Sequence, residues 1–333
     1  MPSLLDSPLP VSAPAAAPVG FDAVLGRSPK IAWIVSSGGH LTQAMEIERL
    51  IGVNPDSVWI TNASTHAGSA LEGRRTVAAP YVAPRDVLGS ARAALLARRV
   101  LREESFDHVV STGAAVAGLA LPLARLLGHA PVFVESVARR RGPSLTGRIA
   151  KACPGVAAFA QSPFLVGRGW GYIGSVLGGW EPVTVTGATT SGPRRVFVTL
   201  GTIRPYRFDR AVEAVLAALR PDDQVVWQLG ATTRADLPGE VHDDMPVDDV
   251  RRAIREADVV VTHSGFGTVF ECFRAGKAPV LVVRERVHDE HVDDHQRELA
   301  HEVAARGLGL VLDLAAPSAE ILDGATSRGV RGE

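Results

Sequence analysis

Residues 261–271, VTHSGFGTVFE, join a β-branched apolar run to a glycine-containing turn that leads into a helical pattern. A helix that starts at such a turn leaves its first backbone N–H groups unpaired and has its positive dipole end there. Phosphate groups bind at helix starts of this kind. The segment therefore predicts a strand, a turn and a helix of an α/β fold, with an anion site at the turn.

The same order of elements occurs twice more in the chain. Residues 31–51 and residues 194–219 each begin with an apolar strand, turn at a glycine and continue as a helix. Strands that alternate with helices are typical of parallel sheets covered on both faces. The length of 333 residues predicts two such domains, and the Gly-, Thr- and Pro-rich segment 178–195 predicts the linker between them, with a boundary near residue 190.

These signals divide the chain into four parts. We predict a disordered tail over residues 1–28, domains over 29–190 and 191–316, and a C-terminal tail over 317–333. The first tail is rich in proline and has no Lys or Arg before Arg27, so it does not match a signal peptide. No apolar stretch approaches the roughly 20 residues that cross a bilayer.

The composition excludes several classes of protein. The chain has 35 Lys+Arg against 36 Asp+Glu, so no overall field attracts nucleic acid. Its two cysteines, Cys153 and Cys272, exclude a disulfide framework and fit a reducing cytoplasm.

The first domain has polar residues at the ends of two predicted strands. His40 follows the first strand and is a candidate general base, because imidazole titrates near neutral pH; its alternative role is to cap the helix. Glu135 follows another apolar strand and is the second candidate base. The arginines behind it fit a pyrophosphate, or else a solvated face. The candidate acceptor contacts are Ser37, Gly38, Gly39, Arg139, Arg140 and Arg141.

The second domain has two glycine turns that follow strands. Gly201–Thr202 and residues 262–268 can bind one diphosphate from two sides. Glu271 lies about one helical turn beyond the second glycine turn, within reach of a ribose whose two hydroxyls donate to one carboxylate. Its alternative role is to complement the dipole of the helix.

A polar segment follows an apolar strand, over residues 284–300. His291 and His295 have the spacing of two metal ligands on one helical face, but no third ligand at a familiar spacing completes a site. We therefore predict no metal. His295 and Gln296 are the candidate contacts to a donor sugar.

Taken together, these motifs resemble glycosyltransferase family 28. VFVTLGT, VVVTHSGFGTVFE and DDHQRELA resemble its catalytic C-terminal half, including the eukaryotic subunit that adds the second GlcNAc to a dolichol-linked oligosaccharide. SSGGHLTQ and VFVESVARRRGPSLTGRIAK resemble the acceptor-binding, membrane-recruiting subunit of that enzyme and of bacterial exopolysaccharide transferases. The chain resembles the two subunits fused, over about residues 30–315.

The resemblance implies a GT-B fold, in which two Rossmann-like domains face each other across a cleft. It implies inverting transfer of a sugar from a UDP-sugar to a polyprenyl-pyrophosphate-linked saccharide, in surface polysaccharide or glycolipid assembly, with no metal or other cofactor. GlcNAc is the favoured sugar, and a hexose or glucuronate stays open. It also implies His40 or Glu135 as the base. The implied donor contacts are Gly201, Thr202, Val247, His263, Ser264, Gly265, Gly267, Thr268, Glu271, His295 and Gln296.

The chain departs from this family at its start, where a proline-rich tail replaces the membrane helix of the acceptor-binding subunit. We therefore expect a cytoplasmic protein that contacts the inner face of the plasma membrane peripherally, around residues 87–101. Three alternatives remain: a UDP-GlcNAc 2-epimerase on the same fold, a nucleotide-sugar-binding subunit without activity, and a soluble natural-product glycosyltransferase. The acceptor-half motifs argue against the epimerase.

Overall fold

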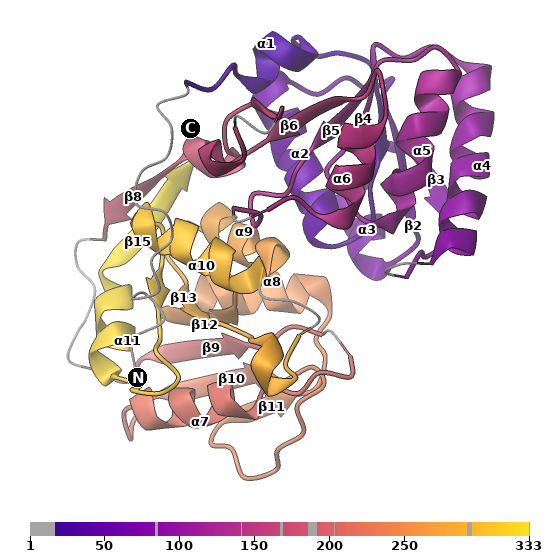
Figure 1. Ribbon diagram of the computed structural model, residues 1–333. Coiled ribbons are helices and arrows are strands. Elements are labelled where there is room, and N and C mark those ends of the chain that lie inside the picture. Colours follow the sequence, from indigo (N-terminus) through magenta and orange to yellow (C-terminus); the bar gives the residue numbers. More distant parts are fainter. Residues whose placement is uncertain are drawn as a thin grey trace. The chain divides into compact units, whose positions relative to one another are not determined.

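The computed structural model describes residues 17–332, apart from residues 84, 85, 141, 167, 168, 186–191, 203 and 292–294. Contacts within the chain divide it into an N-terminal unit that ends at Gly178 and a C-terminal unit that starts at Gly179. Each unit contains one parallel sheet with helices packed on it (Figure 1). The prediction of an α/β fold with two parallel sheets is confirmed.

The N-terminal unit has a seven-stranded sheet in the order β3-β2-β1-β4-β5-β6-β7. Its strands are β1 (Ile31–Ile34), β2 (Val58–Asn62), β3 (Arg75–Ala79), β4 (His108–Ser111), β5 (Pro131–Val134), β6 (Ala157–Ala160) and β7 (Gly171–Tyr172). Its helices are α1 (Phe21–Leu25), α2 (Gly39–Ile51), α3 (Thr65–Ala70), α4 (Val87–Glu103), α5 (Ala115–Leu126) and α6 (Leu145–Ala152), with short turns η1 (Pro163–Leu165) and η2 (Val176–Gly179).

Successive side chains of β1 pack on opposite faces of this sheet, as the period of a strand requires. Ala32 and Ile34 join the core that contains residues of α4, α5 and α6. Trp33 points to the other face and stacks on Trp59, with ring centroids 5.0 Å apart. Because both faces are buried, β1 reads as a continuous apolar run.

The C-terminal unit has a six-stranded sheet in the order β11-β10-β9-β12-β13-β14. Its strands are β9 (Arg195–Thr199), β10 (Gln224–Gln228), β11 (Glu240–His242), β12 (Val259–His263), β13 (Val280–Val282) and β14 (Leu310–Val311). Its helices are α7 (Asp209–Ala218), α8 (Val247–Glu256), α9 (Phe266–Arg274), α10 (His295–Ala305) and α11 (Ala319–Thr326), with the short turn η3 (Arg286–His288).

The central strand β9 is also buried on both faces. Val196 and Val198 pack in a core that includes Leu322 of α11. Phe197 points the other way and packs with Ile254 of α8. This burial explains the apolar run that predicted the strand.

The predicted linker and the predicted C-terminal tail contain a further pair of strands. β8 (Trp180–Thr184) pairs antiparallel with β15 (Arg328–Gly332), so the C-terminal unit starts near residue 179 and not near 190. The Trp180 ring packs on Phe270 and Phe273 of α9, at centroid distances of 5.9 and 5.4 Å. Local composition could not reveal this pairing, because the two partners are about 150 residues apart.

The prediction of a C-terminal tail from residue 317 is wrong, because α11 buries Leu322 and Ala325 in the core of its unit. The buried Arg194 also forms ion pairs with Asp223 and with Asp323 of α11. At the other end, α1 buries Phe21, so the tail predicted over residues 1–28 ends earlier. Its residues 1–16 lie outside the described part of the chain.

Among the described residues, no helix has the length and apolarity that a membrane span needs. Cys153 and Cys272 are both free thiols.

Candidate active site

The strands β9, β12 and β13 are neighbours in the C-terminal sheet, so the residues after them lie at one edge. In open parallel sheets this carboxyl edge is where ligands bind. Gly201 follows β9, His263 ends β12, and Arg284 follows β13. The structure thus brings both predicted glycine turns to the same edge.

His263 and the backbone of Gly230 pack closely against the turn at Gly201. Gly201 has φ +76°, and a Cβ atom there would lie 2.6 Å from His263 Cε1. Gly230, after β10, has φ +66°, and its Cβ would lie 1.8 Å from the Gly201 carbonyl oxygen. Only glycine fits at either position, because it lacks the Cβ that would collide. Thr202 follows directly and extends the turn.

His263 is enclosed by glycine backbone on two sides. A Cβ on Gly265 would lie 2.2 Å from its Nε2, as one on Gly201 would lie against Cε1. Burial, together with the nearby charge of Arg284, lowers the pKa of His263 to about 3. The imidazole is therefore neutral at physiological pH and has one N–H to donate.

Helix α9 begins at Phe266, three residues after this histidine, with Gly265 as its N-cap residue. The first-turn N–H groups of Phe266, Gly267 and Thr268 have no acceptor within the helix. Ser264 is 1% exposed, and its hydroxyl has no hydrogen-bond partner in the described structure. The start of α9 therefore offers several donors to an anion.

Glu271 lies on the same helix and pairs with two arginines. Its carboxylate contacts Arg251 of α8 at 3.0 Å and Arg274 at 2.8 Å. Arg251 lies one helical turn after Val247, the half-buried first residue of α8. The Arg251–Glu271 pair thus joins α8 to α9, and with them the residues predicted to contact the uracil and the ribose.

His295 and Gln296 form the start of α10. Gln296 is 2% exposed, and its Oε1 has no hydrogen-bond partner in the described part of the chain. The His295 ring lies 4.8 Å from that of His291, which lies 6.3 Å from that of Tyr206. Outside residues 292–294 and the other undescribed positions, no three His, Cys, Asp or Glu residues gather as a metal site.

In the N-terminal unit, His40 lies in the first turn of α2 and is held by the loop after β4. Its Nδ1 lies 2.9 Å from the Thr112 carbonyl oxygen, and the Thr112 hydroxyl donates to the His40 carbonyl oxygen at 2.8 Å. The imidazole packs on Gly113, whose Cβ would lie 2.6 Å from Cε1. Because a carbonyl only accepts, Nδ1 carries the proton and Nε2 has the lone pair of a base.

Glu135, the second candidate base, follows β5 and is 1% exposed. It accepts hydrogen bonds from the backbone N–H groups of Ser136 and Ser144, at 3.0 and 2.8 Å, and from the Ser144 hydroxyl at 3.0 Å. Burial raises the pKa of Glu135, and these hydrogen bonds oppose the rise. Since Ser144 is the N-cap of α6, Glu135 fixes the start of that helix.

The candidate acceptor contacts form two groups. Ser37 donates its N–H to Asn62 at 2.9 Å and accepts from the Asn62 amide at 2.8 Å, just before Gly38 and Gly39 start α2. The guanidinium of Arg140 lies 4.7 Å from the centre of the Phe164 ring. The backbone N–H of Arg139 donates to Ser136, and Arg141 lies outside the described residues.

The C-terminal unit is similar in sequence to a known enzyme family. The model of the glycosyltransferase family 28 C-terminal domain matches residues 195–310. A UDP-N-acetylglucosamine--N-acetylmuramyl-(pentapeptide) pyrophosphoryl-undecaprenol N-acetylglucosamine transferase of Burkholderia mallei is 28% identical over 268 residues, which is 74% of this chain and 68% of that protein. The chain contains a family 28 C-terminal domain and is a UDP-sugar glycosyltransferase. All predicted donor residues of this glycosyltransferase, from Gly201 to Gln296, fall within the matched region.

Two solved structures resemble this glycosyltransferase over about nine tenths of its chain. SnogD, a glycosyltransferase from Streptomyces nogalater, has a TM-score of 0.53 and 20% identity, covering 90% of this chain and 92% of its own. UDP-GlcNAc 2-epimerase from Methanocaldococcus jannaschii, solved with UDP-GlcNAc and UDP, has a TM-score of 0.53 and 12% identity, covering 89% and 91%. Transferases and epimerases thus share this GT-B fold of two Rossmann-like units.

Two residues of this glycosyltransferase escaped the sequence interpretation. Gly230 lies two residues after the end of β10, as Gly201 lies two residues after the end of β9 and Gly265 two after the end of β12. Arg284 is 0% exposed although it is charged, and it lies two residues after the end of β13. In both cases the available signal was an unusual residue at a strand end.

Proposed function

We propose that this glycosyltransferase moves a sugar, preferably GlcNAc, from a UDP-sugar to a polyprenyl-pyrophosphate-linked saccharide with inversion. The start of α9 beside the Gly201 turn is the observation that carries the proposal. Its unpaired N–H groups and the buried, unpartnered Ser264 hydroxyl fit a diphosphate leaving group. The relative from Burkholderia mallei is named for a reaction of this kind.

The remaining donor contacts follow from the same edge of the sheet. We propose that Val247 holds the uracil by its backbone and that Glu271 accepts from the ribose. Each carboxylate oxygen has two acceptor sites, so Glu271 can bind ribose while it keeps Arg251 and Arg274. The unpartnered Oε1 of Gln296 is suited to a sugar hydroxyl or amide, with His295 beside it.

We assign the general base to His40. The acceptor oxygen forms a bond to the anomeric carbon, the bond from that carbon to UDP breaks, and UDP takes the electron pair. The acceptor proton passes to His40 Nε2, since Nδ1 is fixed by Thr112. Glu135 is enclosed by Ser136 and Ser144, which supports a role in positioning α6 instead. No step uses a metal, because helix and backbone N–H groups neutralise the diphosphate.

The donor and the acceptor are tested together. Purified full-length protein is incubated with a panel of UDP-sugars, with and without a polyprenyl-pyrophosphate-linked saccharide, while UDP release is measured. We expect release that depends on the lipid-linked acceptor and is fastest with UDP-GlcNAc. Conversion of UDP-GlcNAc to its 2-epimer without acceptor, or equal transfer to soluble aglycones, would contradict the proposal.

We also propose that α4 contacts the inner face of the plasma membrane. Leu88 and Leu95 are 72% and 62% exposed and share one helical face with the exposed Arg92 and Arg99. Apolar side chains beside arginines suit the interface of an anionic bilayer. The double substitution Leu88→Ser and Leu95→Ser should reduce sedimentation with phosphatidylglycerol vesicles. Val53→Ser, which removes another exposed apolar side chain of this unit, should not; equal effects would exclude α4.

A further inference from the structure

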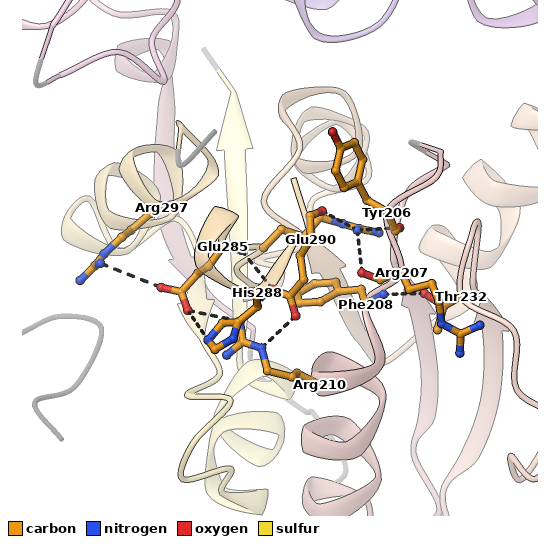
Figure 2. A network of polar contacts seen from close by, with 10 residues as sticks. Tyr206, Arg207, Phe208, Arg210, Thr232, Glu285, His288, Glu290 and Arg297 are labelled. Carbon is orange, nitrogen blue, oxygen red and sulfur yellow. Dashed lines mark hydrogen bonds and ion pairs between the residues drawn. The ribbon is translucent and has the colours of Figure 1, made fainter. Parts of the chain in front are cut away.

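Arg284 is a fully buried arginine whose hydrogen-bond partners are backbone carbonyls. Its NH2 group donates to Leu200 at 2.7 Å, and its NH1 group donates to Glu290 at 2.9 Å and to Tyr206 at 3.1 Å. The guanidinium also lies 4.7 Å from the centre of the Phe208 ring. Figure 2 shows Tyr206, Phe208 and Glu290 around this network.

These partners belong to two separate loops. Leu200 and Tyr206 lie in the loop from β9 to α7, and Leu200 directly precedes the Gly201 turn. Glu290 lies in the loop from β13 to α10, which leads to His295 and Gln296. One side chain therefore connects the backbone before the proposed diphosphate turn with the backbone before the proposed sugar contacts.

The same two loops are also in contact through aromatic rings. The ring of Tyr206 stacks with that of His291 at 6.3 Å and 28°, and the His291 ring meets that of His295 edge-on at 4.8 Å. The contact chain thus runs from the first loop to the first residue of α10. In addition, Arg210 of α7 donates two 2.8 Å hydrogen bonds to the Glu290 carboxylate (Figure 2). These bonds fix the second loop to α7.

Stability alone is a weak reason for a charge at this place. Removing a guanidinium from water costs free energy that neutral carbonyls offset only in part. Burial lowers the pKa of Arg284 to about 10, so it is still charged at neutral pH. In addition, its Nε–H has no hydrogen-bond partner in the described structure. A planar fork of donors, however, can hold carbonyls that point from different loops, which a lysine ammonium cannot reproduce.

We propose that Arg284 is a positioning residue. It holds the Gly201–Thr202 turn, which binds the diphosphate, at a fixed distance from the start of α10, which contacts the sugar, so that one UDP-sugar contacts both. The assignment rests on the proposed function, since it presumes that UDP binds at Gly201 and the sugar at His295 and Gln296. Arg284 itself does not contact the substrate. It therefore acts on donor affinity and on the preference for UDP-sugar over UDP.

The test compares Arg284→Lys with Arg194→Lys in the full chain. Arg194 is a matched control, because it is a buried arginine of the same unit that pairs with Asp223 and Asp323. Calorimetry gives the affinity of each variant for UDP and for UDP-GlcNAc, and thermal unfolding gives its stability. Steady-state kinetics with a lipid-linked acceptor separates KM from kcat.

We expect Arg284→Lys to weaken UDP about 10-fold or more, the scale of hydrogen bonds to a charged group that the displaced turn loses. It should weaken UDP-GlcNAc further, so that the ratio of the two affinities moves toward one and KM for the donor rises. Arg194→Lys should lower the unfolding temperature and leave both affinities unchanged.

Wild-type affinities in Arg284→Lys, or the same affinity losses in both variants, would overturn the assignment. Wild-type protein that binds neither ligand would overturn the proposed function, and the assignment with it. If Arg284→Lys does not fold, Tyr206→Leu decides, because it removes the half-buried ring that contacts His291 and leaves the backbone partners of Arg284. It should reduce the preference for UDP-GlcNAc and spare UDP affinity; an unchanged preference overturns the coupling.

Discussion

Gly230→Ala provides a direct test of the diphosphate turn. The new Cβ would lie 1.8 Å from the Gly201 carbonyl oxygen, whereas real Cβ atoms keep at least 3.0 Å from such an atom. Either the backbone of Gly230 or the turn must therefore move by more than 1 Å. A hydrogen bond at about 2.9 Å does not survive a shift of that size.

The expected magnitude follows from the donors that the turn supplies. Each hydrogen bond to a charged group contributes about 1.5–3 kcal/mol. Loss of one such bond from the Gly201–Thr202 turn should weaken UDP about 10- to 100-fold. Alanine at φ +66° also strains the backbone by roughly 1–2 kcal/mol, which reduces the free energy of unfolding without acting on the ligand.

Gly276→Ala separates these two effects. Gly276 lies in the same unit at φ +73°, and its nearest neighbour for an added Cβ is the Val330 carbonyl oxygen at 3.8 Å. This control carries the same backbone strain without the collision. Calorimetric titration with UDP, at a temperature where circular dichroism shows both variants folded, gives the comparison. If Gly230→Ala binds UDP as tightly as Gly276→Ala does, the Gly201 turn does not hold the diphosphate.

Three further predictions concern the base, the metal and pH. His40→Ala should lower turnover about 10²- to 10⁴-fold at unchanged UDP affinity, and Glu135→Gln should mainly lower the unfolding temperature; the reverse pattern in kinetics would assign the base to Glu135. Turnover in excess EDTA should equal turnover without it, because N–H groups neutralise the diphosphate, and a loss that Mn²⁺ restores would contradict this. The pKa of His263 is about 3 when folded and ordinarily 6.5, so between pH 7.5 and 5.0 mainly the unfolded chain gains this proton. Stability should therefore fall by about 2 kcal/mol over that range from this group. Urea unfolding of His263→Asn should not show this pH-dependent loss of stability. A pH dependence identical to that of the wild type would refute the argument that burial keeps His263 neutral.

The local sequence was sufficient to predict the elements that build the site. An apolar run, a glycine turn and a helical pattern lie within about ten residues of one another in 261–271, so their order alone indicates a strand that ends at an anion site. The same holds for Gly201 after β9 and for His40 after β1. These signals are local because burial on both faces makes a strand apolar, and the turn after it needs glycine.

Only the tertiary structure decided which of these elements meet and what each side chain contacts. The approach of Gly230 to Gly201, the pairing of β8 with β15 and the ion pairs of Glu271 depend on which strands and helices become neighbours. The same is true of Arg284, whose carbonyl partners lie as far as 84 positions away in the chain. A polar side chain in an apolar segment indicates that it needs a hydrogen-bond partner. Burial removes water as that partner, so the side chain must bond to whichever group the fold brings close. That group is set by the packing of distant segments, which no local sequence pattern records.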